Sequence, residues 1–451
     1  MKLKFLLTKV ALISICTLVM GCNIIKNDSI GNPKEKVTVK VLYESESAFF
    51  TNYGSLFISK YPNVDFQVIP FPYTSNTASG EEIEQAYDMV IQEEQPDILF
   101  LYPDQVERYS NKEQLYDLDP LIVQDKFDLE NIHPAVTDYI RSIGTGRLLA
   151  LTPNFYGKAI FYNKDLFDQY QIPYPNDDMT WEDIMLLAQR FSPESTSSHG
   201  IMFGSNQNSL FKLALDIGEA NNLTYLDLKN RKITINSDSW KEVFRMVLNA
   251  YQSDSIYAEG GGAKPGITYR EILLQHPFIT NQAAMSVEGH HFLKDLKFAE
   301  ELNPEATPKW DVIAFPSNDG QLGSEDSIWI QYVVSINAKS TNINTAWEVV
   351  KYINSEEFTR AALKSTLQDS LPTRKEVLSN AAYNLDAFYR PSMNPYLSTT
   401  NRKISQSFYD SFQSFSEMKV NEALRGGISL DEMLTSIEQK GQELLLQEKT
   451  D

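Results

Sequence analysis

The chain has 451 residues, which exceeds the size at which a single hydrophobic core keeps growing, so two lobes or domains are expected. Its 42% hydrophobic and 12% aromatic residues indicate a globular protein, and its formal net charge of −20 argues against a nucleic-acid-binding surface, which needs clustered Lys and Arg. Both cysteines, Cys16 and Cys22, lie at the N-terminus, which excludes a disulfide, a thiolate metal site and a cysteine nucleophile from the body of the protein.

The N-terminal residues have the pattern of an export signal (1–21) followed by a polar tether (22–36). Three lysines within the first nine residues precede an apolar run over residues 10–20, which is too short to span a bilayer. The run ends in L-V-M-G-C at Cys22 and resembles the bacterial lipobox. This resemblance implies cleavage before Cys22 and attachment of a lipid to its sulfur. A cleaved secretory peptide with an incidental cysteine is the alternative.

The body begins with alternating strands and helices. Strands are predicted at 37–43, 64–70 and 98–101, with helices between them that run to about residue 60 and over 80–94. This rhythm favours a mostly parallel sheet with helices on both faces. Ligands of such sheets bind beyond the carboxyl ends of the strands, which makes Glu44 and Ser45 candidate binding residues. Ser45 is equally suited to capping the helix that follows.

The stretch Arg147 to Phe167 has two strand-like halves joined by Thr152 to Gly157, with no turn signal between them. We interpret it as a chain crossing from one lobe to the other. A crossing places aromatic side chains at a lobe interface, where pockets for small molecules tend to lie. An internal strand pair with Pro153 at a bulge is the alternative.

The remaining elements follow in similar order. Thr180 and Asp183 have the spacing of a capping box at the start of a helix. The strand 329–336 has the pattern of a crossing back between lobes, and Gly260 to Gly262 form a loop that lacks the following Lys and Ser or Thr of a phosphate cradle. Further strands are predicted at 232–236, 283–291 and 310–316, and further helices at 211–217, 239–252, 345–354 and 431–448.

Seven landmarks occur in family order and resemble the family 1 extracellular solute-binding proteins of ABC importers, the sugar-binding group. The landmarks are residues 96–99, 115–122, 149–167, 180–183, 282–285, 313–316 and 346–353. The resemblance implies an α/β fold of two lobes, each a mostly parallel sheet flanked by helices, joined by hinge strands. It implies an N-terminal lobe of residues 37–154 plus 332–377, and a C-terminal lobe of residues 155–331 plus 378–451.

The resemblance also implies a function. The protein would be anchored by lipid on the extracytoplasmic side of the cell membrane, capture a carbohydrate, here an oligosaccharide, between its lobes, and deliver it to an ABC permease. It would act as a monomer, without catalysis, cofactor or metal. The expected ligand-binding residues are Glu44, Ser45, Tyr102, Asp104, Asn154, Phe155, Tyr156, Glu288, His290, His291 and Trp329. Many members carry an aromatic residue where this chain has His290 and His291, and Tyr409 is a candidate for a further pocket aromatic.

Three other functions compete with this interpretation. A secreted glycoside hydrolase needs two carboxylates about 5–9.5 Å apart, for which Glu44, Asp104 and Glu288 are candidates. A metal-binding lipoprotein would use His290 and His291, but adjacent residues of a strand point to opposite faces. A surface adhesion or structural lipoprotein would present flat patches to its partner.

Overall fold

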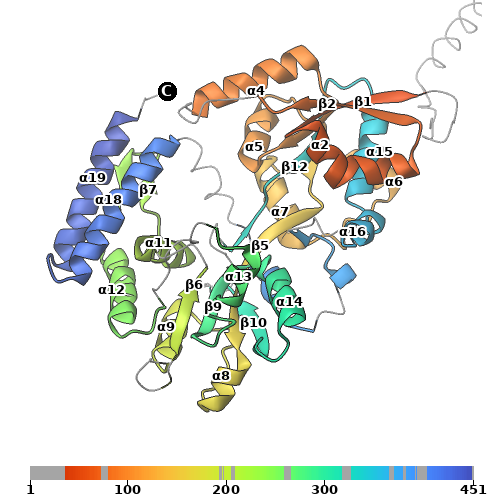
Figure 1. The fold of residues 1–451 in the computed structure, drawn as a ribbon. Helices are drawn as coiled ribbons and strands as arrows, with labels where there is room; N and C mark the ends of the chain where they lie inside the picture. Colours follow the sequence, from red (N-terminus) through yellow and green to blue (C-terminus); the bar gives the residue numbers. More distant parts are fainter. Residues whose placement is uncertain are drawn as a thin grey trace, which may run out of the picture.

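Two β-sheets, one in each lobe, organise the fold (Figure 1). The computed structural model describes residues 36–72, 80–191, 196, 198–204, 209–257, 266–316, 327–364, 370–378, 382–391, 393 and 404–448. The predicted signal segment, Cys22, all of the tether except Lys36, and the loop Gly260 to Gly262 lie outside these residues. No helix of the described part is long and apolar enough to cross a membrane.

The first sheet has the strand order β2-β1-β3-β12-β4, in which β1 is parallel to β2 and β3, and β12 is antiparallel to β3 and β4. Its strands are β1 (Val37–Tyr43), β2 (Val64–Pro70), β3 (Ile98–Leu101), β4 (Ala150–Leu151) and β12 (Val333–Ile336). The surrounding helices are α2 (Glu46–Phe49), the π-helix η1 (Phe50–Gly54), α3 (Ser55–Lys60), α4 (Gly80–Glu94), α5 (Pro103–Asn111), α6 (Asp119–Asp125), α7 (Pro134–Ile143), α15 (Ile343–Ile353) and α16 (Glu356–Ala362).

Strand β3 is buried along its whole length, as its uninterrupted apolar sequence predicts. The residue before it, Asp97, is 4% exposed and holds the strands together at this end of the sheet. Its carboxylate accepts hydrogen bonds from the Lys40 amide at 2.9 Å and from the Ser340 hydroxyl at 2.6 Å. This landmark of the sequence therefore has a structural role, because a buried carboxylate needs such partners.

The second sheet has the order β10-β5-β9-β6. Its strands are β5 (Asn154–Asn163), β6 (His199–Phe203), β9 (Ala283–Gly289) and β10 (Trp310–Ala314), and a separate hairpin joins β7 (Leu226–Asp227) to β8 (Lys232–Ile233). The accompanying helices are α8 (Lys164–Gln169), α9 (Trp181–Ala188), α11 (Leu210–Ala220), α12 (Asp238–Gln252), α13 (Tyr269–Leu274), α14 (Phe292–Leu302), α17 (Asp386–Tyr389), α18 (Gln406–Leu424) and α19 (Leu430–Gln447).

The two-lobed α/β fold is confirmed. In the first sheet only β12 runs against the other four strands, whereas the second sheet is mixed. In the second sheet β5 is antiparallel to both β10 and β9, and only β6 and β9 run parallel. The direction of β5 is set by its neighbours β9 and β10, which come from residues more than a hundred positions later in the chain.

The two faces of β5 pack into different cores. Ala159 and Phe161 belong to one core, which contains the first lobe and continues to α14, whereas Ile160 and Tyr162 belong to the core of α9, α11 and α12. This separation follows from the period of two in a strand. It also fixes the side chains near the start of β5, because even-numbered and odd-numbered residues must point to opposite faces.

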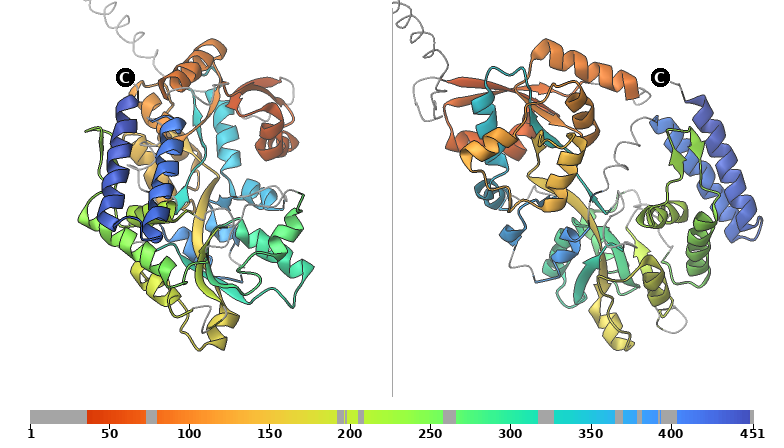
Figure 2. Two further views of the ribbon diagram at one scale, coloured as in Figure 1. Left: turned by 60° about the vertical axis from the view of Figure 1, so that its left-hand side comes forward. Right: turned by 180° about the vertical axis from the view of Figure 1, so that it is seen from behind.

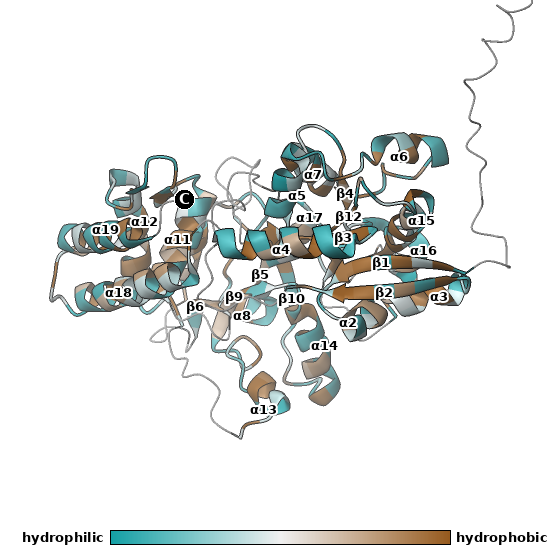
Figure 3. Cartoon of the chain, turned by 90° about the horizontal axis from the view of Figure 1, so that it is seen from above, coloured by the Kyte–Doolittle hydropathy of each residue, from teal (hydrophilic) through white to brown (hydrophobic). Residues whose placement is uncertain are grey.

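The C-terminal helices α18 and α19 run side by side as a hairpin (Figure 2). Gly426 lies at the break between them with φ of +73°, a conformation that glycine adopts without strain. Ser429 and Glu432 form a capping box at the start of α19. In the first lobe, α4 is mainly hydrophilic on its exposed surface, whereas β1 and β2 are hydrophobic (Figure 3).

Glu417 on α18 makes the stability of the hairpin depend on pH. One of its carboxylate oxygens is buried without a hydrogen-bond partner in the described chain, and burial raises the pKa of Glu417 to about 7. The folded pKa lies above the unfolded value, so the free energy of unfolding should fall as the pH rises from about 4.5 through 7. We expect Glu417→Gln to stabilise the protein at pH 8 by about 1–2 kcal/mol. This is less than the free energy that corresponds to the whole pKa shift, because the Glu417 carboxylate is partly solvated.

Chemical denaturation at pH 5 and pH 8 measures this difference. Glu443→Gln is the matched control, since Glu443 lies on the partner helix, is exposed and pairs with Lys440. The same loss of stability between pH 5 and pH 8 in the wild type and in Glu417→Gln would show that Glu417 is not the group responsible.

Candidate functional site

Three short segments meet at the start of β5, between the two sheets. The first is the passage from β4 into β5, and the second is β11 (Ile328–Trp329), which pairs with β5 before the chain enters β12. Both crossings are confirmed. The third segment, β13 (Leu371–Pro372), pairs with Phe155 and Asn154 and was not predicted. A hinge of three strands therefore joins the lobes.

Two aromatic side chains from different crossings stack on each other at this hinge. Tyr156 and Trp329 are paired in register, and their rings lie 5.3 Å apart at an angle of 15°. Both are partly buried. The Tyr156 hydroxyl donates a hydrogen bond to the Gln331 side chain at 2.9 Å, and the His290 ring lies edge-on to Tyr156 at 5.5 Å. The pair presents an aromatic surface bordered by polar groups.

Phe155 does not share this surface, although the sequence interpretation placed all of Asn154 to Tyr156 there. The strand begins at Asn154, earlier than expected, so alternation turns Phe155 to the opposite face. Its side chain is fully buried and packs against His133 at 5.4 Å and Tyr389 at 5.1 Å. Burial lowers the pKa of His133 to about 4, which keeps this cluster uncharged at neutral pH.

The first lobe contributes Glu44, Ser45, Tyr102 and Asp104, which follow the neighbouring strands β1 and β3 as expected. The exposed Glu44 carboxylate accepts a hydrogen bond from the Tyr332 hydroxyl at 2.7 Å, and the Tyr102 and Tyr332 hydroxyls lie 3.2 Å apart. Ser45 caps α2 by accepting from the Ala48 amide at 3.2 Å. Asp104 lies in the first turn of α5.

Asn154 faces the first lobe from the hinge. Burial raises the pKa of the Tyr53 phenol well above its usual value, with smaller effects from Tyr43, Tyr156 and Asn154. Burial also raises the pKa of Tyr43 to about 12, with smaller effects from Asn52, Glu44 and Tyr156. The neutral phenols of Tyr43 and Tyr53 therefore lie between the carboxyl end of β1 and the aromatic residues of the hinge.

The second lobe separates Glu288 from the other candidates. Glu288 is 5% exposed and lies opposite Ala159 on the face of the sheet that packs under α14. Its carboxylate accepts from the Ser286 hydroxyl at 2.8 Å and lies 3.3 Å from His276. The structure thus places the expected binding residue Glu288 on the face of β9 that Ala159 shares, and not on the face of Tyr156, as strand alternation dictates.

The two adjacent histidines lie beyond β9 and not within it. His290 is buried against Tyr156, whereas His291 is exposed and precedes the first residue of α14. Within the described ranges, no group of three or more His, Cys, Asp or Glu side chains is placed to hold a metal ion. Tyr409, the other aromatic candidate, is partly buried on α18 beside Phe408, with ring centroids 5.4 Å apart.

The sequence interpretation missed four polar residues near the hinge. Gln331 and Tyr332 lie between β11 and β12 at the second crossing, as Tyr156 lies at the first. Lys158 and Asp216 approach to 4.0 Å with side chains 15% and 11% exposed, which places a desolvated ion pair beside the hinge. Strand alternation predicts Lys158 on the same face as Tyr156. Asp216 has no such signal, because it lies on a distant helix.

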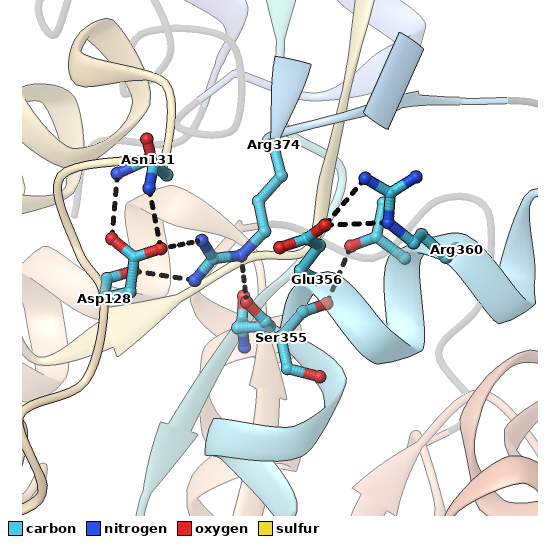
Figure 4. Close-up of polar contacts among 8 residues, drawn as sticks. Asp128, Asn131, Ser355, Glu356, Arg360 and Arg374 are labelled. Carbon is cyan, nitrogen blue, oxygen red and sulfur yellow. Dashed lines mark hydrogen bonds and ion pairs between the residues drawn. The ribbon is translucent and has the colours of Figure 1, made fainter. Parts of the chain in front are cut away.

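The third hinge segment is fixed by Arg374, whose side chain is 4% exposed (Figure 4). Its guanidinium donates to the Asp128 carboxylate at 3.0 Å, to the Asp128 carbonyl at 2.7 Å and to the Asn354 carbonyl at 2.8 Å. The neighbouring Thr373 amide donates to the Pro153 carbonyl at 2.9 Å. These bonds connect β13 to the first lobe and to the residue before β5.

Known proteins share this architecture. The sugar-binding protein MalE of Xanthomonas citri is 16% identical, with 91% of this chain and 98% of that chain covered and a TM-score of 0.63. A family 1 extracellular solute-binding protein of Alicyclobacillus acidocaldarius is 13% identical, with coverages of 91% and 99% and a TM-score of 0.65. A cyclic alpha-maltosyl-1,6-maltose binding protein of Arthrobacter globiformis is 14% identical, with coverages of 91% and 99% and a TM-score of 0.54.

These identities are low, so the likeness shows the two-lobed fold. A search of curated protein sequences gives no match. The family model described as bacterial extracellular solute-binding protein matches residues 63–389, which is more than half of the chain and includes the first two hinge crossings and β13. The chain therefore belongs to the family of bacterial extracellular solute-binding proteins.

Proposed function

We propose that the protein binds a carbohydrate between its lobes outside the cytoplasm and delivers it to the permease of an ABC importer. The observation that carries this proposal is the stacked pair Tyr156 and Trp329 at the hinge, bordered by Gln331 and His290. Sugar rings have an apolar face that stacks on aromatic rings and hydroxyls that such polar groups can hydrogen-bond. Two of the structural relatives are described as sugar-binding or maltoside-binding proteins, which supports the same ligand class.

The finer parts of the proposal concern the site and its ligand. The ligand is an oligosaccharide, and the residues that contact it are Glu44, Ser45, Tyr102, Asp104, Asn154, Tyr156, His290, His291 and Trp329. Phe155 and Glu288 are left out because their side chains pack into the protein on other faces of β5 and β9. The lobes close on the ligand by a hinge motion, which the ligand favours by binding the closed state more tightly.

The remaining parts concern anchoring and partners. We propose that the lipobox-like sequence at Cys22 anchors a monomer to the outer face of the cell membrane, and that its protein partners are the subunits of the permease. The protein performs no chemistry on the sugar. The burial of Glu288 beside Ser286 and His276 supports this, because it engages one of the three candidate carboxylates inside the protein.

Isothermal titration with a panel of mono- and oligosaccharides tests the proposal. We expect saturable binding of at least one sugar at one site per chain, with the sugar recovered intact by chromatography. Release of a shorter product would show an enzyme. Absence of binding to every carbohydrate of the panel would contradict a sugar-binding function.

A further inference from the structure

One carboxylate of the first lobe is set against aromatic rings. Phe71, Tyr102 and Tyr332, here called the aromatic group, are all partly buried. The ring centroids of Tyr102 and Tyr332 lie 4.8 Å apart, those of Phe71 and Tyr332 5.5 Å apart, and those of Phe71 and Tyr102 6.3 Å apart. Glu44 is exposed and contacts this group through the hydroxyl of Tyr332 at 2.7 Å.

The charge of Glu44 has no counterion in the described chain. Its partner is the phenol of Tyr332, and the pKa of Tyr332 is raised above its usual range by burial and by hydrogen bonds to Tyr102 and Glu44. Tyr332 therefore remains a neutral donor at physiological pH and orients the carboxylate without neutralising it. The second carboxylate oxygen is left for another donor, since Glu44 is exposed.

The aromatic group is continuous with the hinge aromatics. Gln331 is the residue before Tyr332, and its side chain accepts the hydrogen bond of Tyr156. The rings of Tyr43 and Tyr332 lie 6.0 Å apart, and the Tyr43 phenol is influenced by both Glu44 and Tyr156. Tyr43 thus links the residue that holds Glu44 to the hinge, and we take Glu44 to belong to the same proposed site as Tyr156 and Trp329.

The combination of an unneutralised carboxylate and aromatic faces favours a cation over a neutral or anionic group. An ammonium group is attracted by the negative faces of aromatic rings and forms charge-assisted hydrogen bonds to a carboxylate. An anion gains neither contact here. The amino end of α5 is a poor anion site, because Asp104 occupies its first turn and the Gln105 side chain accepts from the Tyr102 amide at 3.0 Å.

We infer that the ligand carries a protonated amine, as an amino sugar does, and that Glu44 with the aromatic group forms the subsite for that amine. The inference rests on the proposed carbohydrate-binding function and narrows its ligand class. Glu44 supplies the charge, Tyr332 positions the carboxylate, and the rings of Tyr102 and Phe71 complete the surface. Sugars in which a carboxylate replaces this group are rejected.

Titration calorimetry at pH 7 with matched sugars tests the inference on the full chain. Each mono- and disaccharide is offered in four forms, with a hydroxyl, an amine or an acetamido group at carbon 2, or as the uronic acid. We expect the amine form of the preferred sugar to bind at least about tenfold more tightly than its hydroxyl form, and the uronic acid not to bind. In Glu44→Gln the ratio between the affinities for the amine and hydroxyl forms should fall from at least about tenfold to about one, because only the amine form loses a charge-assisted contact.

Glu46→Gln is the matched control, because Glu46 is an exposed carboxylate two residues away without a contact to Tyr332. This variant should keep the preference for the amine. Equal or tighter binding of the hydroxyl or acetamido form would overturn the inference and leave the proposed function intact. So would an equal loss of affinity for the amine and hydroxyl forms in Glu44→Gln. Failure of all sugars to bind would overturn both.

Discussion

Replacing Arg374 with methionine is expected to lower the free energy of unfolding by about 3 kcal/mol, because the substitution removes a buried charge whose partners are backbone carbonyls and a carboxylate. The Asn354 carbonyl loses its 2.8 Å bond from the guanidinium, and the Asp128 carbonyl loses its bond at 2.7 Å. Methionine fills much of the volume of the arginine side chain. The decrease in the free energy of unfolding therefore arises from the lost hydrogen bonds more than from a cavity.

The same region contains a control for this prediction. Arg360 pairs with Glu356 at 2.7 Å on the surface of α16, where the two side chains are 56% and 59% exposed (Figure 4). Exposed pairs of this kind contribute little, so Arg360→Met should change the free energy of unfolding by less than about 0.5 kcal/mol. Chemical denaturation of both variants measures the difference. Equal effects at the two arginines would mean that the third hinge segment is not held by Arg374.

Much of the first lobe could be predicted from sequence because its signals are local. The alternating residues of β1, the fully apolar β3 and the helical spacing of α4 gave bounds that agree with the structure. The capping box at Thr180 and Asp183 is also confirmed, with both reciprocal hydrogen bonds present. In each case the residues that determine the element lie within the element or next to it.

The direction of β5 could not be predicted in this way. A strand is parallel or antiparallel because of its neighbours, and the neighbours of β5 come from residues more than a hundred positions later. The rule that alternating strands and helices make a parallel sheet assumes helical crossovers. That assumption fails where a strand passes directly between two lobes.

The residues of the candidate site also differ in whether a local signal in the sequence indicates their position. Tyr156 and Trp329 were predicted because each lies at a crossing and is aromatic. Phe155 and Glu288 were expected at the ligand because they are close in sequence to Tyr156 and His290. The face that each side chain occupies is determined by alternation along the strand. Tyr332 was overlooked although it is the residue that contacts Glu44 and Tyr102, since a contact across 288 positions has no local pattern.

Replacing Trp329 with alanine is expected to weaken binding of the cognate sugar about 10- to 100-fold. This corresponds to a loss of about 1.4–2.8 kcal/mol of binding free energy, because one aromatic stacking surface is removed. The hinge should remain folded, because Trp329 is partly buried and β11 keeps its backbone pairing with β5. Trp329→Phe retains an aromatic face and should recover most of the affinity. Recovery by phenylalanine separates the loss of stacking from a general disturbance of the hinge.

Another stacked aromatic pair, outside the hinge, serves as the control. Tyr269 and Phe298 lie 6.4 Å apart at an angle of 10° on α13 and α14, and Tyr269 is 57% exposed. Tyr269→Ala removes an aromatic ring of the same kind from outside the hinge, so affinity should stay within about twofold of the wild type. Isothermal titration of the three variants decides the matter. Unchanged affinity in Trp329→Ala, or an equal loss in Tyr269→Ala, would remove the Tyr156 and Trp329 pair from the binding site.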